Sequence, residues 1–244
     1  MSLPLKKHAL LNLNFWVKSR EDIFHLLLPS SCLVCECEWK DNIPICSWCF
    51  EELKFTDFEN YIEPTPLDRV FWGRVDLHAS FALLHFEKNT STQNLLHAIK
   101  YGNRPGLAFA LGELIGQRIE KMNGFRNADL IIPVPLHPKK QFIRGYNQSE
   151  QLALGIGKIL SLPVETKIVR KASHASSQTR KGRFQRWTNV DGNFLVKKGL
   201  PENMHIVIVD DVVTTGATLE AMILSIKQVY PKSIVSIISL ALAS

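Results

Sequence analysis

Residues 206–219 read Ile-Val-Ile-Val-Asp-Asp-Val-Val-Thr-Thr-Gly-Ala-Thr-Leu. The unbroken apolar residues at the start predict a buried strand, and the two carboxylates of Asp210 and Asp211 stand at its carboxyl end. The threonines and the glycine of residues 214–218 then open a helix. Ligands bind at the carboxyl ends of strands in open α/β sheets, and a helix N-terminus offers free N–H groups to a phosphate. The stretch therefore predicts a site for a sugar monophosphate whose vicinal diol faces the acidic pair.

A nucleoside-triphosphate P-loop is excluded, because the loop lacks the lysine of that motif. One alternative interpretation remains, an ordinary strand-to-helix loop with a solvated acidic pair and with Thr215 or Thr218 as a helix cap.

Strands and helices alternate around this stretch. Continuous apolar runs between helical patterns are typical of a parallel sheet covered on both faces, so we expect an α/β fold with a mainly parallel sheet flanked by helices. The strands expected in this half of the chain are 129–134, 164–169, 205–209 and 233–242, and the helices are 149–160 and 219–229.

The first half of the chain is less regular. Helical spacing of apolar residues predicts helices, and alternation predicts one strand, before the α/β pattern begins. The helices expected are 1–28, 50–58, 105–122 and one that ends near Lys100 after a cap at Ser91 or Thr92; the strand is 75–81, and 61–68 is expected to be a linker. We predict two domains, residues 1–60 and residues 61–244.

The composition fits a globular protein. Of 244 residues, 45% are hydrophobic and 21% charged, which excludes a disordered tail, a collagen-like fibre and a coiled coil. The net charge of +6 mildly favours an anionic partner. The longest apolar stretch is shorter than the roughly 20 residues of a spanning helix, and no signal peptide is evident. We therefore expect a cytoplasmic protein without a membrane span.

All five cysteines lie between residues 32 and 49. Cys32 and Cys35 form one C-x-x-C pair, and Cys46 and Cys49 form another, which predicts a structural four-sulfur zinc site. Cys37 is the fifth cysteine and is an alternative to Cys35 as ligand. Free or redox-active thiols remain the other interpretation.

Several further motifs carry a family resemblance. They include Ile132-Pro133-Val134-Pro135-Leu136, Arg144-Gly145-Tyr146-Asn147-Gln148, Ile99-Lys100-Tyr101 and the four cysteines. Together with residues 206–219 they resemble the ComF/GntX family, whose members have roles in competence and DNA utilisation and a type I phosphoribosyltransferase fold. The resemblance covers roughly residues 24 to 244. Tyr146 replaces a common phenylalanine, and Ser177, Arg180 and Lys181 depart from the usual residues around Gln178.

The resemblance implies a role for each residue of the site. Asp210 and Asp211 would bind the ribose hydroxyls of phosphoribosyl diphosphate (PRPP) and act as the catalytic pair, and the loop would wrap the 5-phosphate, with Mg²⁺ bound through the substrate. The substrate-binding residues expected are Asp210, Asp211, Val212, Thr214, Thr215, Gly216, Ala217, Thr218, Lys100, Lys139, Arg144 and Arg183. The loop Pro135–His137 would hold the leaving pyrophosphate.

Residues 170–186 are rich in lysine and arginine and contain no acid. They are expected to form the mobile hood that closes over the diphosphate and excludes water. The same residues could instead bind a nucleic-acid backbone or form a solvated basic loop.

Three functions remain open from the sequence. The first is an enzyme that transfers ribose 5-phosphate to a nitrogen nucleophile and releases pyrophosphate. The second is a non-catalytic competence protein that binds PRPP or single-stranded DNA, with other DNA-uptake proteins as partners. The third is a zinc-nucleated scaffold for partner proteins.

Overall fold

The computed structural model describes residues 31–32, 34–39, 45–62, 64–172, 187–189 and 194–243, with the backbone alone at 187–189. The helix predicted for residues 1–28 and the greater part of the basic segment 170–186 lie outside these residues. The chain forms two compact units, Met1–Glu51 and Glu52–Ser244. The domain boundary that we place between residues 60 and 61 stays a prediction.

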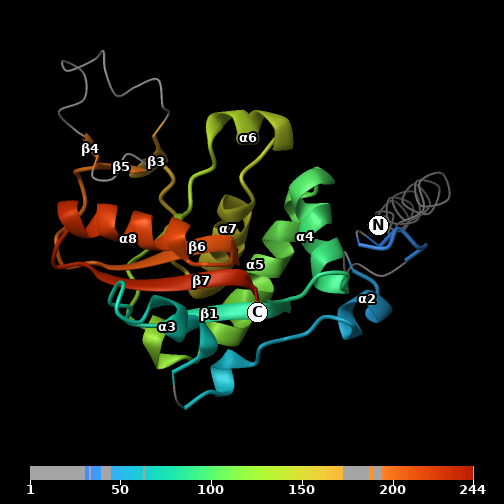
Figure 1. Cartoon of the computed structure of the whole chain (residues 1–244). Coiled ribbons are helices and arrows are strands. Elements are labelled where there is room, and N and C mark those ends of the chain that lie inside the picture. The colour runs from blue at the N-terminus through green and yellow to red at the C-terminus, as the bar shows by residue number, and fades with distance from the viewer. Residues whose placement is uncertain are drawn as a thin grey trace, which may run out of the picture. The chain divides into compact units, whose positions relative to one another are not determined.

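The larger unit is built on a parallel sheet in the order β1-β7-β6-β2 (Figure 1). Its strands are β1 (Ser80–Phe86), β2 (Leu130–Pro133), β6 (His205–Val213) and β7 (Ile234–Ala243). All three pairings in this sheet are parallel. The expected parallel α/β architecture is confirmed.

Both faces of the sheet are covered. Successive side chains of a strand point to opposite faces, yet residues 205–210 of β6 and residues 235–242 of β7 are buried without interruption. Two helices, α5 (Pro105–Ile119) and α7 (Gln148–Leu160), pack closely against each other. α5 packs on β7, and α7 packs on β6 and β2, so this helix pair covers the central strands.

Four further helices belong to this unit. They are α3 (Pro66–Phe71), α4 (Ser91–Tyr101), α6 (Pro138–Arg144) and α8 (Ala217–Val229). Two 3₁₀ turns cover Phe58–Asn60 and Asn123–Phe125. A second, antiparallel sheet has the order β3-β5-β4, with β3 at Val169–Lys171, β4 at Trp187–Asn189 and β5 at Phe194–Lys197.

The strand predicted at residues 75–81 is wrong in position. β1 begins at Ser80 and is buried on both faces over Ser80–Leu84, so its pattern is a continuous apolar run. The alternation at Val75, Leu77 and Ala79 belongs to the segment before the strand, whose intervening residues Asp76 and His78 are exposed. Alternation predicts a half-buried strand, and β1 is a fully buried one.

The strand predicted at 164–169 is also wrong. Val164 makes only an isolated bridge to Ile131, and the strand β3 begins later, at Val169. The side chain of Glu165 accepts a hydrogen bond from the backbone N–H of Lys167 at 2.6 Å. This local turn interrupts the extended backbone that the apolar residues favour.

Three further predictions in the first half of the chain need correction. The short helix lies at α2 (Ser47–Glu51) instead of 50–58, and 61–68 is not all linker because α3 begins at Pro66. Thr65 and Asp68 form a capping box at the start of α3, which was the sequence signal for this helix. The N-cap of α4 is Thr90 rather than Ser91 or Thr92.

The remaining boundaries differ by a few residues. α5 ends at Ile119 rather than Met122, α8 begins at Ala217 rather than Leu219, and β6 extends past Val209 to Val213. The extension of β6 matters for the site, because it places Asp210 and Asp211 inside the strand.

Candidate functional site

Asp210 is a nearly buried carboxylate near the end of β6, with 9% of its surface exposed. Its Oδ1 accepts a hydrogen bond from Ser149 Oγ at 3.1 Å and another from the backbone N–H of Asp211 at 2.8 Å. Burial, and next the charge of Asp211, raise the pKa of Asp210 to about 7. The first acid of the pair is therefore held from α7, and it loses its proton only near neutral pH.

Asp211 forms an ion pair with a residue far away in the sequence. Lys100 Nζ, in the last turn of α4, lies 3.2 Å from Asp211 Oδ2. The side chains of Lys100 and Asp211 are 24% and 16% exposed. Lys100, predicted as a site residue, is thus brought directly to the acidic pair.

The end of α4 and the start of α7 are tied together by Tyr146. Its hydroxyl donates a hydrogen bond to the carbonyl of Ile99, and burial raises the pKa of this phenol to about 12. Next to it, Asn147 Nδ2 donates to the carbonyl of Val134 at 3.0 Å, just after β2. The motif of residues 144–148 therefore joins α4, α7 and β2 around the acidic pair.

The loop between β6 and α8 is open to solvent at its polar residues. Thr214, Thr215, Ala217 and Thr218 are exposed, whereas Gly216 is buried. The first N–H groups of a helix have no partners inside the helix, so the start of α8 offers donors to an anion here. Thr215 Oγ1 lies 3.5 Å from the N–H of Ala217.

This loop packs against α3 and is bound by a residue that follows that helix. Gly216 has φ +75°, and a Cβ atom at this position would lie 2.9 Å from the ring of Phe71 and from Val70. Arg74 Nη1 donates to the carbonyl of Thr215 at 2.6 Å, and Arg74 also pairs with Glu220 in the first turn of α8. The loop backbone is therefore packed against α3 and anchored by one arginine.

The other predicted cations are spread over the unit. Lys139 is exposed on α6, which has no buried residue and stands clear of the sheet in Figure 1. Arg144 ends α6, donates to Gln148 Oε1 at 2.9 Å and lies 5.5 Å over the ring of Tyr101. Arg183 lies outside the described residues.

A cavity of about 580 Å³ adjoins the end of β2. Pro135 and Leu136 of the predicted pyrophosphate loop line it, together with Asn147, Arg170 and Lys171. The third loop residue, His137, caps α6, with its Nδ1 accepting from the N–H of Lys139 at 3.2 Å. The cavity therefore brings the loop Pro135–His137 close to the first cations of the basic segment.

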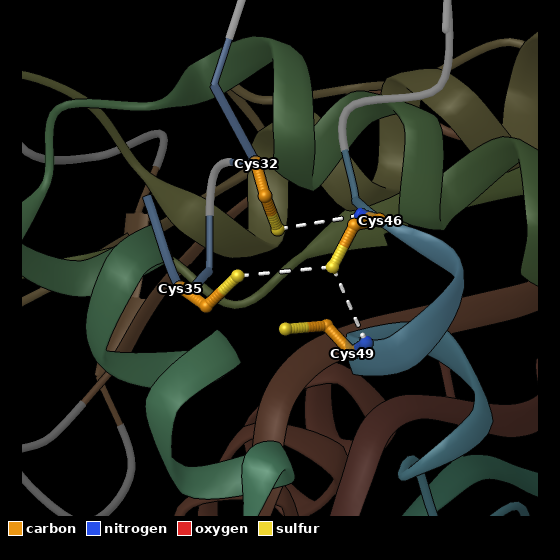
Figure 2. Close-up of side chains that lie close together, drawn as sticks. All are labelled: Cys32, Cys35, Cys46 and Cys49. Carbon is orange, nitrogen blue, oxygen red and sulfur yellow. Dashed lines mark hydrogen bonds between the residues drawn. The ribbon is translucent and has the colours of Figure 1, made fainter. Parts of the chain in front are cut away.

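The smaller unit brings four cysteines together. The sulfur atoms of Cys32, Cys35, Cys46 and Cys49 all lie within 4.8 Å of one another. Figure 2 shows the four side chains pointing toward a common centre. With Zn–S bonds of about 2.3 Å, tetrahedral zinc needs sulfur atoms roughly 3.8 Å apart. Sγ of Cys35 and Sγ of Cys46 are 3.7 Å apart, so this donor set fits zinc.

Backbone N–H groups support two of these sulfur atoms. Cys32 Sγ accepts from the N–H of Cys46 at 3.3 Å and of Val34 at 3.4 Å, and Cys46 Sγ accepts from the N–H of Cys49 at 3.4 Å. Although burial opposes it, this backbone hydrogen bonding lowers the pKa of Cys32 to about 6. Cys37 is exposed, and its Sγ lies 3.1 Å from Sγ of Cys35.

Sequence reasoning missed two residues that shape the site, Ser149, which holds Asp210, and Arg74, which anchors the loop. Tyr146 was named in the family motif, but its contact that ties α7 to α4 was not predicted. Ser149 and Tyr146 lie in or beside the motif of residues 144–148, which was the available signal. For Arg74 no pattern in the sequence points to Thr215, because the contact spans 141 residues.

No helix in the described part of the chain is both long enough and apolar enough to cross a membrane.

Comparison with known proteins finds relatives of the part of the chain that carries these residues. The family model for the phosphoribosyl transferase domain matches residues 100–244. The DNA utilization protein YhgH of Salmonella typhimurium is 31% identical over 129 residues, which cover 51% of this chain and 56% of that protein. Competence protein F of Haemophilus influenzae is 26% identical over 203 residues, which cover 80% of this chain and 83% of that protein.

Among solved structures, an adenine phosphoribosyltransferase from Trypanosoma brucei is similar with a TM-score of 0.38 and 11% identity, covering 66% of this chain and 83% of that one. The match to YhgH covers little more than half of the length of that protein.

The family match includes Lys100, the motif of residues 144–148, the acidic pair and the loop to α8. With its parallel sheet and its site after β6, the chain has the type I phosphoribosyltransferase fold and belongs to the phosphoribosyl transferase domain family, as a homologue of competence protein F and YhgH.

Proposed function

We propose that this chain binds PRPP at the carboxyl end of β6. The observation that carries the proposal is the acidic pair Asp210 and Asp211 followed directly by an exposed threonine loop at the start of α8. The acidic pair accepts hydrogen bonds from the ribose hydroxyls, and Thr214–Thr218, with Val212 beside them, surround the 5-phosphate.

The reaction proposed is transfer of ribose 5-phosphate to a nitrogen nucleophile. The nitrogen lone pair forms a bond to C1 of the ribose, the bond from C1 to the diphosphate oxygen breaks, and pyrophosphate leaves. The nitrogen then releases its proton to solvent or to the departing pyrophosphate. Asp210 and Asp211 hold the ribose, so the chain contributes orientation and charge stabilisation.

The cavity beside β2 is the proposed binding place of the diphosphate group of PRPP. The cavity beside β2 is lined by Pro135, Leu136 and Lys171, and Lys139 follows on α6. We assign the diphosphate to this side of the site, together with Arg144 and Arg183. Magnesium bound to PRPP would be held mainly by the substrate itself and would supply charge neutralisation for the diphosphate beside Lys139 and Lys171.

Calorimetric titration of PRPP with Mg²⁺ tests this proposal. The wild type is expected to bind in the micromolar range, and the double variant Asp210→Asn/Asp211→Asn is expected to lose binding. Asp76→Asn is the matched control, because this exposed carboxylate precedes β1 and lies outside the proposed site. Absence of PRPP binding by folded wild type contradicts the proposal.

A second candidate function is non-catalytic binding of PRPP or of single-stranded DNA. One observation favours it: α6 exposes Lys139, Lys140 and two large apolar side chains, Phe142 at 90% and Ile143 at 76%. Two cations and one aromatic side chain, Phe142, on the same exposed helix suit a single strand. Steep loss of oligonucleotide binding with rising salt, and no pyrophosphate release with any acceptor, would favour this candidate.

We further propose that Cys32, Cys35, Cys46 and Cys49 hold a structural zinc ion. Zinc thiolate sites need reduced cysteines, and a reducing cytoplasm provides them, so the proposal includes a cytoplasmic location. The names of the relatives point to DNA uptake or utilisation as the setting, with other DNA-uptake proteins as partners.

A further inference from the structure

The two carboxylates at the end of β6 differ in their availability. Asp210 is nearly buried, and its Oδ1 already accepts two hydrogen bonds, from Ser149 and from the backbone of Asp211. Asp211 is more exposed, and its Oδ2 pairs with Lys100. Of the two, Asp211 is therefore the acid that is more available to the hydroxyls of a vicinal diol.

A carboxylate binds a vicinal diol only when its oxygens point toward the hydroxyls. A neighbouring cation can hold that orientation by pairing with one of the oxygens. Lys100 supplies that cation at 3.2 Å, and both side chains are more than three-quarters shielded from solvent, which limits screening by salt. Lys100 thus fixes the direction of the Asp211 carboxylate.

The position of Lys100 is itself fixed. The Tyr146 hydroxyl donates to the carbonyl of Ile99, the residue directly before Lys100. The pairing oxygen, Asp211 Oδ2, still has a second lone pair, and the ammonium group has two further N–H donors. A hydroxyl can therefore bind to Asp211 without displacing Lys100.

We propose that Lys100 is a positioning residue that makes this site selective for ribose over 2-deoxyribose, acting through Asp211. The inference rests on the proposed function, since it concerns the same ribose 5-phosphate site. Its consequence is that Lys100 contributes to recognition of the diol more than to recognition of the phosphate, which the loop to α8 binds separately.

The test compares ribose 5-phosphate with 2-deoxyribose 5-phosphate by calorimetric competition against PRPP. Wild type is expected to favour the ribose compound by about tenfold, which equals about 1.4 kcal/mol. Lys100→Met and Asp211→Asn are each expected to reduce this preference to about twofold or less, and their combination to reduce it no further. Lys100→Arg, which keeps the charge, is expected to retain most of the preference.

Lys158→Met is the control, because Lys158 also forms an ion pair between two elements, with Glu113 of α5, but this pair is more exposed and lies away from the acidic pair. Its expected selectivity is that of the wild type. If Lys100→Met does not fold, Lys100→Gln replaces it, with the thermal melting temperature as the check.

The outcomes separate two failures. A wild type that binds neither PRPP nor a sugar phosphate refutes the proposed function. A wild type that binds PRPP but does not distinguish the two sugar phosphates, or a selectivity that survives in Lys100→Met, leaves the proposed function standing and overturns the role of Lys100. If Lys100 had only a structural role, its substitution would weaken binding of both sugar phosphates equally and leave the ratio of their two affinities unchanged.

Discussion

The hydroxyl of Ser149 donates a hydrogen bond to Oδ1 of Asp210 at 3.1 Å, between two residues that are 61 positions apart. Ser149 lies in the first turn of α7, and Asp210 lies near the end of β6. Both side chains are buried, at 4% and 9% exposure. The bond therefore fixes the nearly buried acid of the site from a helix that also packs on the sheet.

Ser149→Ala should make the stability of the protein more sensitive to pH. The substitution removes one of the two donors to Asp210 Oδ1, so ionising this buried acid becomes more costly. We expect a loss of about 1–2 kcal/mol at pH 8 and a smaller loss at pH 5, measured by urea unfolding. Ser225→Ala removes a hydroxyl that donates to the carbonyl of Ala221, so its cost should be the same at both pH values.

Asp210 should also give wild type a pH-dependent stability that Asp210→Asn lacks. Its pKa rises from 3.8 in the unfolded chain to about 7 in the folded one. Between these values the folded state keeps a proton that the unfolded state has released, so stability falls as pH rises from about 4 to 7. The free energies of unfolding of wild type and variant, measured across this range, should diverge with that slope. Parallel curves would contradict the burial argument.

Gly216→Ala should distort the loop at the start of α8 for two reasons. The position has φ +75°, and the new Cβ would lie 2.9 Å from Phe71 and Val70. We expect a loss of stability of about 1–3 kcal/mol and markedly weaker PRPP binding. Gly73→Ala is the control: its φ is +70° but nothing lies within 4 Å of the added Cβ, so it measures backbone strain alone. Equal effects in both variants would exclude the packing contribution.

Arg74→Ala should weaken PRPP binding although Arg74 does not touch the ligand. Arg74 donates to the carbonyl of Thr215 and pairs with Glu220, so its removal frees the loop that would surround the phosphate. A decrease in affinity of several fold is expected by calorimetry, with only a small change in melting temperature because the pair is partly exposed. Unchanged affinity would mean that the packing of Gly216 is sufficient to hold the loop.

Metal analysis should find one zinc ion per chain in wild type and in Cys37→Ser, and less in Cys32→Ser or Cys49→Ser. Cys32 and Cys49 are buried members of the four-sulfur group, whereas Cys37 is exposed beside it. A chelator should remove amide-exchange protection from residues 31–51 and leave that of the parallel sheet intact. Loss of zinc in Cys37→Ser, or protection retained in the chelator, would contradict the assignment.

The sequence predicts most of the sheet because its central strands are continuous apolar runs between turn signals. β6 and β7 were recognisable for this reason, and so was the acidic pair at the end of β6. β1 was misplaced, because alternating residues before it imitate a half-buried strand while the strand itself is buried on both faces. Burial on both faces depends on helices from elsewhere in the chain, and local patterns do not report it.

The site was predictable only where its residues are neighbours in the chain. The loop 214–218 is contiguous, and so are the cysteine pairs. The contacts between Lys100 and Asp211, between Ser149 and Asp210 and between Arg74 and Thr215 arise from the tertiary fold. Lys100 was named from the family motif, but its partner could not be known without the packing of α4 beside the end of β6.

The strand order also determines when the parallel sheet can be completed during synthesis. Of the four strands of the parallel sheet, β7 is made last, and it lies between β1, which is made first, and β6. A nascent chain that has reached Val213 already contains Lys100, Ser149 and both carboxylates, yet its sheet has a gap where β7 belongs. Until β7 enters, β1 and β6 present unpaired edges, which are sites for wrong pairing. The ligand site should therefore mature abruptly and late, with the insertion of one central strand.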